Sequence, residues 1–181
     1  MQRLLASTEG DDAINIRDRA LILLFAVYGL RVSEVRALKL KDLDSENELL
    51  YVTRSKPRRR QTYPLSYTVG ESLLRYLKEV RPRVRNREVF LTLLAPIQPS
   101  SANSLYCTIA ERFRALNIPS PHCGPHSLRH ACATRLLAEG LSMKEIGDHL
   151  GHRKPDSTRV YAKVDLAGLR QVADFEMGGV L

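Results

Sequence analysis

Hydrophobic residues recur at helical spacing along much of the chain. Leu21, Leu24 and Tyr28 share one face of a helix predicted over 15–28, which Gly29 is suited to end. The same pattern, with capping and turn signals at the boundaries, predicts further helices over 33–38, 69–80, 101–115, 127–139, 142–151, 157–164 and 166–175.

Two shorter segments have the character of strands. Residues 49–53 and 61–65 flank a basic tip at 54–60, and the polar run 44–47 is typical of a turn. Residues 88–92 are a third predicted strand. The expected fold is therefore mainly α-helical with a small antiparallel sheet, an α+β domain without internal repeats.

Composition limits what such a domain can do. A chain of 181 residues with 44% hydrophobic residues fits one globular domain. The net charge of +8 indicates a polyanionic partner, most commonly nucleic acid, although basic side chains can also simply keep a surface soluble. The longest apolar run, 20–27, is too short to cross a bilayer, and no secretory signal follows Met1.

The cysteines give a weaker indication of the compartment. Cys107, Cys123 and Cys132 form no CxxC pair, and their odd number argues against a disulfide framework. We expect three apolar fillers in a reducing, cytoplasmic setting.

Several short motifs contain side chains suited to cleaving a phosphodiester bond without a metal ion. Arginine forks can hold the non-bridging oxygens of a phosphoryl transition state, and a histidine can transfer a proton. A tyrosine among such cations is favoured as the phenolate, the form that attacks. The residues of these types that stand out together are Arg31, Lys56, His126, Arg129, His152 and Tyr161.

These motifs resemble those of the tyrosine recombinase family, which includes phage integrases and Xer-type resolvases. The similarity runs through Gly-Leu-Arg-Val-Ser-Glu at 29–34, Lys56, Pro-Leu at 64–65, His-Ser-Leu-Arg-His at 126–130, Leu-Gly-His at 150–152 and Tyr161. It covers nearly the whole of a catalytic domain. His-x-x-Arg alone is a weak signal, whereas six elements in this order and spacing are specific.

The resemblance implies a role for each residue. Arg31 and Arg129 would clamp the scissile phosphate, with His152 helping to stabilise it. His126 would transfer a proton and Lys56 would act as the general acid. Tyr161 would be the nucleophile that forms a 3′-phosphotyrosyl link, so that no cofactor, metal or ATP is needed.

Other basic and polar residues are predicted to support the site. The hairpin-tip residues expected to contact DNA phosphates are Arg54, Arg58, Arg59 and Arg60. Glu34 is expected to orient the region around Arg31 rather than to react. The competing interpretation is a zinc site at His122, His126 and His130, which Gly124 and Pro125 disfavour because they interrupt the helix.

The predicted function is that of a site-specific recombinase or integrase catalytic domain acting on double-stranded DNA as a tetramer. Residues 1–181 would form this single domain, without the N-terminal DNA-clamping domain usual in the family. The alternatives are a topoisomerase IB-like activity and a DNA-binding domain that has lost catalysis.

Overall fold

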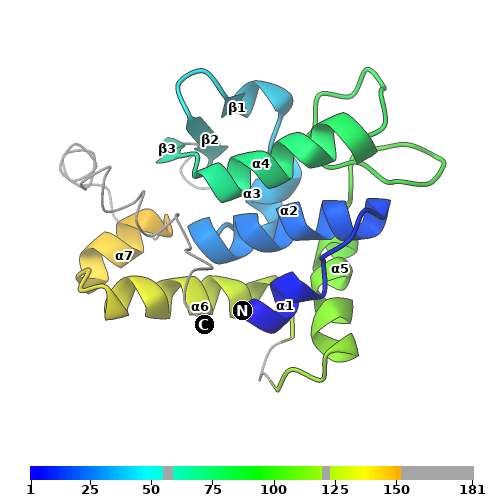
Figure 1. The fold of residues 1–181 in the computed structure, drawn as a ribbon. Coiled ribbons are helices and arrows are strands. Elements are labelled where there is room, and N and C mark those ends of the chain that lie inside the picture. The colour runs from blue at the N-terminus through cyan, green and yellow to red at the C-terminus, as the bar shows by residue number, and fades with distance from the viewer. Residues whose placement is uncertain (55–58, 120–122, 152–181) are drawn as a thin grey trace.

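The computed structural model describes residues 1–54, 59–119 and 123–151, and Figure 1 shows their arrangement. These ranges form a mainly helical domain with one small antiparallel sheet, which confirms the predicted fold class. The predicted helices over 157–164 and 166–175 lie outside the described residues. Within the described ranges, no helix is both long and apolar enough to cross a membrane.

Helix α2 (Ala13–Tyr28) lies at the centre of the packing. Asp12 caps its start by accepting from the amides of Ile14 and Asn15 at 3.1 and 2.9 Å, which the helix itself leaves unpaired. Every residue over 20–28 is buried, because α4 (Tyr67–Arg75) covers one side of α2 and α6 (Pro125–Ala138) the other (Figure 1). Burial of each large apolar side chain contributes about 1.5–3 kcal/mol.

The sheet has the strand order β1-β2-β3, formed by β1 (Leu43–Asp44), β2 (Leu49–Thr53) and β3 (Arg60–Pro64). In β2 the side chains of Leu50 and Val52 are buried, and Leu50 pairs with the buried Tyr63 of β3. This alternation is the one that predicted the hairpin. Strand β1 was not predicted, because two residues are too few for a recognisable alternation.

The remaining elements surround this centre. They are α1 (Gln2–Ala6), α3 (Val32–Ala37), the 3-10 turn η1 (Leu40–Asp42), the π-helical turn η2 (Tyr76–Val80), α5 (Ala102–Ala115) and α7 (Met143–His149). Helices α6 and α7 enclose a second, smaller apolar cluster that contains Cys132, Leu136, Ile146 and Leu150. Cys132 is thus the apolar filler that the sequence suggested.

One predicted helix changes pitch before its end. The helix predicted over 69–80 widens after Arg75 into the π-helical turn η2, where the Arg81 amide donates to the Tyr76 carbonyl at 2.8 Å. The buried Tyr76 ring stacks on Phe90 with the ring centroids 5.1 Å apart. The packing of this ring accompanies the change of pitch, which helical periodicity alone does not reveal.

The strand predicted over 88–92 is wrong, and helix α1 was missed. Glu88 and Leu91 each make one isolated bridge, to Lys39 and Pro99, and the ladder does not extend. Pro99 has no amide hydrogen to donate, which limits pairing there. Helix α1 buries Leu4 and Leu5 but is too short to show a period.

Gly29 provides a test of the packing between α2, α6 and α7. It ends α2 at φ +60°, and an added Cβ would collide with the Leu150 side chain and lie 3.3 Å from the Cys132 sulfur. We expect Gly29→Ala to lower the free energy of unfolding by about 2–4 kcal/mol, from left-handed strain plus overpacking.

Gly140→Ala is the matched control. Gly140 also has a positive φ, of +90°, but its added Cβ would meet no described atom within 4 Å. It should therefore lose only the strain, about 1 kcal/mol. Equal losses in the two variants, measured by chemical denaturation, would contradict the packing described here.

Candidate active site

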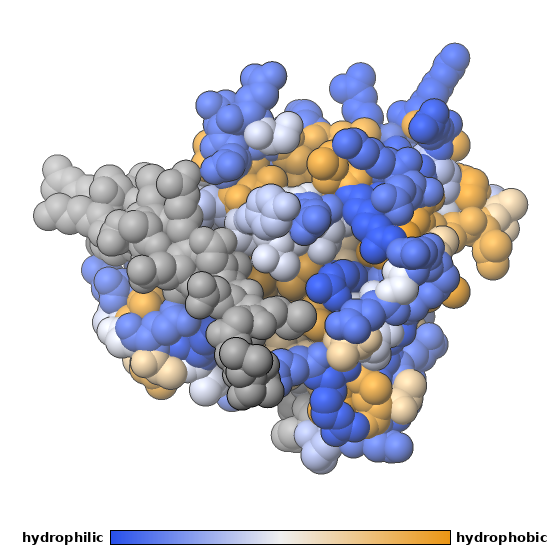
Figure 2. All heavy atoms as spheres, in the orientation of Figure 1, coloured by the Kyte–Doolittle hydropathy of each residue, from blue (hydrophilic) through white to orange (hydrophobic). Residues whose placement is uncertain are grey.

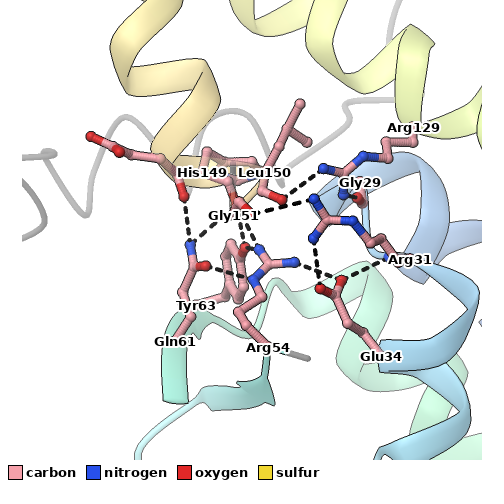
Figure 3. A network of polar contacts seen from close by, with 11 residues as sticks. Gly29, Arg31, Glu34, Arg54, Gln61, Tyr63, Arg129, His149, Leu150 and Gly151 are labelled. Atoms are coloured by element: carbon pink, nitrogen blue, oxygen red, sulfur yellow. Dashed lines mark hydrogen bonds and ion pairs between the residues drawn. The ribbon is translucent and has the colours of Figure 1, made fainter. Parts of the chain in front are cut away.

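Arginines from three separate elements converge on the C-terminal end of α7 (Figure 3). Three successive carbonyl oxygens each accept a hydrogen bond from a different guanidinium. Arg54 donates to the carbonyl of residue 149 at 2.8 Å, Arg129 to that of residue 150 at 2.7 Å, and Arg31 to that of residue 151 at 3.3 Å. A helix leaves its last carbonyls without partners inside the helix, and cations are favourable there. The three contacts hold the backbone that leads directly to residue 152.

A single buried carboxylate joins two of these arginines. Glu34 accepts from Arg31 at 2.9 Å and from Arg54 at 2.6 Å, and its side chain has no solvent exposure. Its carboxylate also accepts the backbone amide of Arg31 at 2.8 Å, at the start of α3. This geometry agrees with the interpretation of Glu34 as a residue that orients the region. Removal of one partner from a buried ion pair typically costs 3–5 kcal/mol.

Arg54 lies inside the protein rather than on its surface. Only 4% of the residue is exposed, and its guanidinium also donates to the Gln61 side chain at 2.8 Å and to the Tyr63 hydroxyl. Gln61 and Tyr63 both donate in turn to the carbonyl of His149. The expectation that Arg54 contacts DNA phosphates is therefore wrong, because its donors are used within the fold.

Arg129 reaches the same region from α6. Its guanidinium donates to the carbonyl of Gly29 at the end of α2, as well as to that of Leu150. Burial, with the positive charge of Arg31 second, lowers the Arg129 pKa to about 10. Arg129 still carries its charge at neutral pH, because this pKa lies well above 7.

The arrangement leaves an excess of positive charge. Arg31, Arg54 and Arg129 contribute three cations and Glu34 one anion, so the cluster has a net charge of two positive units. The Arg31 side chain remains 37% exposed, which places one guanidinium at the edge of the cluster facing solvent. An oxyanion at this edge would meet preorganised donors.

His126 begins the helix that carries Arg129. It is the second residue of α6, after Pro125, and it is exposed. The three-residue spacing places His126 and Arg129 on neighbouring positions of one helical face, as predicted. The other predicted site residues, namely Lys56, His152 and Tyr161, lie outside the described residues, as does Arg58.

Unlike Arg54, the other described basic residues of the hairpin tip face solvent. Arg59 and Arg60 are both exposed. The Arg60 guanidinium stacks over the Tyr51 ring, 3.9 Å from its centroid, and lies 3.8 Å from the Asp42 carboxylate. The Arg60 side chain therefore packs against β2.

No group of three or more His, Cys, Asp or Glu side chains within the described ranges is placed to hold a metal ion. His122, a member of the alternative zinc site, lies outside those ranges. His126 and His130 are both exposed on α6.

His149 is a member of the network that the sequence interpretation missed. It is 3% exposed, its ring meets Tyr63 edge-on with centroids 5.1 Å apart, and its Nε2 has no hydrogen-bond partner among the described residues. Burial, with the charge of Arg54 second, lowers the His149 pKa to about 3. The sequence signal for a buried histidine was its position between the apolar residues Ile146 and Leu150.

Comparison with known proteins shows what the chain resembles. The phage integrase family matches residues 1–167. The protein y4rA of Sinorhizobium fredii, which carries an integrase/recombinase name, is 42% identical over 96% of this chain and 42% of its own length. Another such protein of the same organism, y4gC, is 36% identical over 94% of this chain and 88% of its own length. The chain thus spans less than half of y4rA and most of y4gC.

Solved structures share the fold. The crystal structure of XerA recombinase matches with a TM-score of 0.72 and 23% identity, over 94% of this chain and 59% of that one. The integrase from mycobacterium phage Brujita matches with a TM-score of 0.70 and 27% identity, over 94% and 55%.

Acid unfolding tests the buried state of His149. The folded protein holds this imidazole neutral, with a pKa of about 3, whereas the unfolded chain binds a proton below its ordinary pKa of 6.5. Stability should therefore be lost as the pH falls below 6.5, with this residue contributing about 1 kcal/mol per pH unit.

We expect His149→Leu to flatten this part of the stability profile, whatever its effect on stability at neutral pH. His130→Gln, which removes an exposed imidazole from α6, should keep the wild-type slope. Denaturant unfolding at a series of pH values measures the slopes. Parallel profiles for wild type and His149→Leu would show that His149 does not titrate as described.

Proposed function

Because the chain belongs to the phage integrase family, we propose that it is the catalytic domain of a tyrosine-type site-specific recombinase that breaks and rejoins DNA strands. Residues 1–181 would form one catalytic domain acting in the cytoplasm. Recombination as the general function is supported by the family and the fold together. The chemical steps and the assembly described below are our proposals.

The observation that carries the proposal is the convergence of Arg31 and Arg129. They come from positions 98 residues apart in the chain, yet they donate to the adjacent carbonyls of residues 151 and 150 (Figure 3). Among the described residues, Glu34 is the one carboxylate that forms ion pairs with the arginines of the cluster. A phosphate at the exposed edge would supply the missing negative charge, and more so in a transition state that carries additional charge.

The proposed reaction is a direct displacement at phosphorus. The Tyr161 oxygen would attack the scissile phosphate, forming a bond to phosphorus as the bond to the 5′ oxygen breaks. Lys56 would give a proton to the leaving 5′ oxygen, and His126 would accept the proton of the tyrosine. The 3′-phosphotyrosyl link retains the energy of the broken bond, so a 5′ hydroxyl can reverse the step without ATP.

The arginine network holds the backbone directly before His152. Residues 149–151 are held by arginine donors, and Gly151 adopts φ +68° directly before His152. An added Cβ at Gly151 would lie 2.6 Å from Nε of Arg54, so this turn and the arginine network are packed together. We propose that His152, the next residue in the sequence, acts on the same phosphate.

The proposed partner is duplex DNA, engaged by a tetramer of protomers on paired sites. Structural neighbours include XerH bound to its difH substrate and a lambda integrase tetramer bound to a Holliday junction, with TM-scores of 0.70 and 0.55. A topoisomerase-like activity is the alternative, and it would share the covalent step without strand exchange between duplexes.

Replacement of Tyr161 tests the nucleophile. We expect Tyr161→Phe to abolish covalent attachment to a nicked suicide duplex of randomised sequence, because only the phenolic oxygen is lost. DNA binding should change less than about two-fold, since no charge is removed. Adducts are scored on denaturing gels. Tyr67→Phe is the matched control, because it removes the same atom from a tyrosine that is 77% exposed on α4.

Adduct formation that persists in Tyr161→Phe would exclude Tyr161 as the nucleophile. An adduct lost from both tyrosine variants would point to a general defect rather than to chemistry at residue 161.

Chelation tests whether protein cations suffice for catalysis. We expect the rate of adduct formation to be unchanged in excess EDTA, because Arg31, Arg129, His152 and Lys56 are assigned the charge neutralisation. The rate is measured before and after chelation, and again after zinc or magnesium is restored. A rate that disappears with EDTA and returns with either ion would replace this mechanism by a metal-dependent one.

A further inference from the structure

The loop after η2 is built around one arginine. Arg81 donates to the carbonyls of four residues in or beside the loop: Pro82 at 3.2 Å, Asn86 at 2.6 Å, Glu88 at 2.9 Å and Val89 at 3.1 Å. Its guanidinium fills the inside of the loop and its donors are used there. The loop therefore has a defined shape, and Arg83, Arg85 and Arg87 are left exposed on its outside.

This loop is joined to the segment after α3. The amide of Val89 donates to the carbonyl of Leu38, and the amide of Leu40 donates to that of Arg87, both at 2.9 Å. The side chains of Lys39 and Lys41, which flank Leu40, are exposed. Two basic segments that are far apart in sequence are thus fastened side by side.

Together these segments form what we call the basic ridge, made of Lys39, Lys41, Arg83, Arg85 and Arg87. None of the five forms an ion pair with another residue in the described part of the chain. By contrast, Arg17, Arg75 and Arg112 elsewhere on the domain are each paired with a carboxylate. The ridge therefore groups five exposed cations that have no ion-pair partner in the described part of the chain.

The ridge continues from the hairpin of the candidate active site. The Arg60 guanidinium lies 3.8 Å from the Asp42 carboxylate at the end of η1, and Asp42 also accepts the amide of Lys39 at 3.0 Å. Figure 2 shows hydrophilic side chains projecting along the upper edge of the molecule, where Figure 1 places β1 and the loop after α4. The hairpin and the ridge are therefore neighbouring basic surfaces, linked through Asp42.

We propose that the basic ridge binds the phosphate backbone of duplex DNA outside the cleavage site. The inference rests on the proposed function for its choice of partner and adds a binding surface to it. Exposed cations without carboxylate partners gain from phosphate contact, because each contact releases counterions condensed on the DNA. Such contacts position a protein on DNA without reading its sequence. If the ridge were only solvated, removal of its charges would change DNA affinity no more than removal of equal charge elsewhere on the domain.

The test is a binding titration at several salt concentrations, with Tyr161→Phe as the background so that cleavage cannot distort the measurement. Arg83→Gln/Arg85→Gln removes two ridge charges while Arg81 keeps the loop in shape. On a duplex of several helical turns, we expect the slope of log affinity against log salt to become shallower by about 1–2. Arg114→Gln/Lys144→Gln is the matched control, since it removes equal charge from exposed positions on α5 and α7.

The control should keep the slope of the background protein. Equal changes in both double variants would attribute the effect to net charge and overturn the proposal, as would an unchanged slope in the ridge variant. Circular dichroism of the ridge variant should match the background, which confirms that the loop change has not unfolded the domain.

Catalysis is measured separately, in protein that retains Tyr161. At saturating protein, the ridge variant should form adduct at the wild-type rate. If wild type forms no adduct, the proposed function fails while the binding comparison still decides the ridge. If wild type forms adduct and only the ridge variant is slow at saturation, the ridge acts in catalysis and the proposal of a separate binding surface is wrong.

Discussion

The end of helix α7 is the feature on which the candidate site depends. A short helix offers carbonyl oxygens that lack partners, and here each of three successive carbonyls meets a guanidinium from a different part of the fold. Arg54 comes from the hairpin, Arg31 from the start of α3, and Arg129 from α6. The apolar cluster between α6 and α7 is small, so these hydrogen bonds supply much of what holds α7 to the rest of the domain. Positioning of the site and stability of this corner are thus achieved by the same bonds.

Charge balance explains why the network contains a carboxylate, Glu34, and a neutral histidine, His149. Arginines held close together repel one another, and Glu34 reduces this repulsion while it accepts from two of them. His149 lies among the same arginines and is buried, which lowers its pKa to about 3 and keeps it neutral. A protonated imidazole there would add a further cation without a carboxylate to offset it. With Glu34 as its anion and His149 neutral, the network keeps a net positive charge, and Arg31 lies at its exposed edge.

The sequence predicted the elements and missed the connections between them. Helix α2 and the β2–β3 hairpin were predictable because burial imposes a period of 3.6 on one and of 2 on the other. Arg31 and Arg129 were singled out as candidates because six motifs in one order and spacing are specific together, although His-x-x-Arg alone is weak. Arg54 was misjudged because it begins the basic segment 54–60, and a basic segment does not show which of its members turns inward. Its partners Gln61 and Tyr63 come from the next strand, and the carbonyl of residue 149 comes from α7, so only the tertiary fold reveals the contact.

The arginines of this domain differ in whether they are desolvated and ordered during folding or only when a partner binds. Arg129 is desolvated and hydrogen-bonded during folding, so little reorganisation would remain on binding of the phosphate that we propose. Arg83 and Arg85 are exposed, and their side chains must be ordered when a partner binds, which costs up to about 2 kcal/mol each. The first arrangement suits a site that must stabilise a transition state, since donors already in place favour the charge that develops there. The second suits weak, reversible contacts along a backbone, which let a protein move on DNA before it reacts. If the domain acts as we propose, the buried arginines would serve the reaction and the exposed arginines of the ridge would serve binding along the DNA.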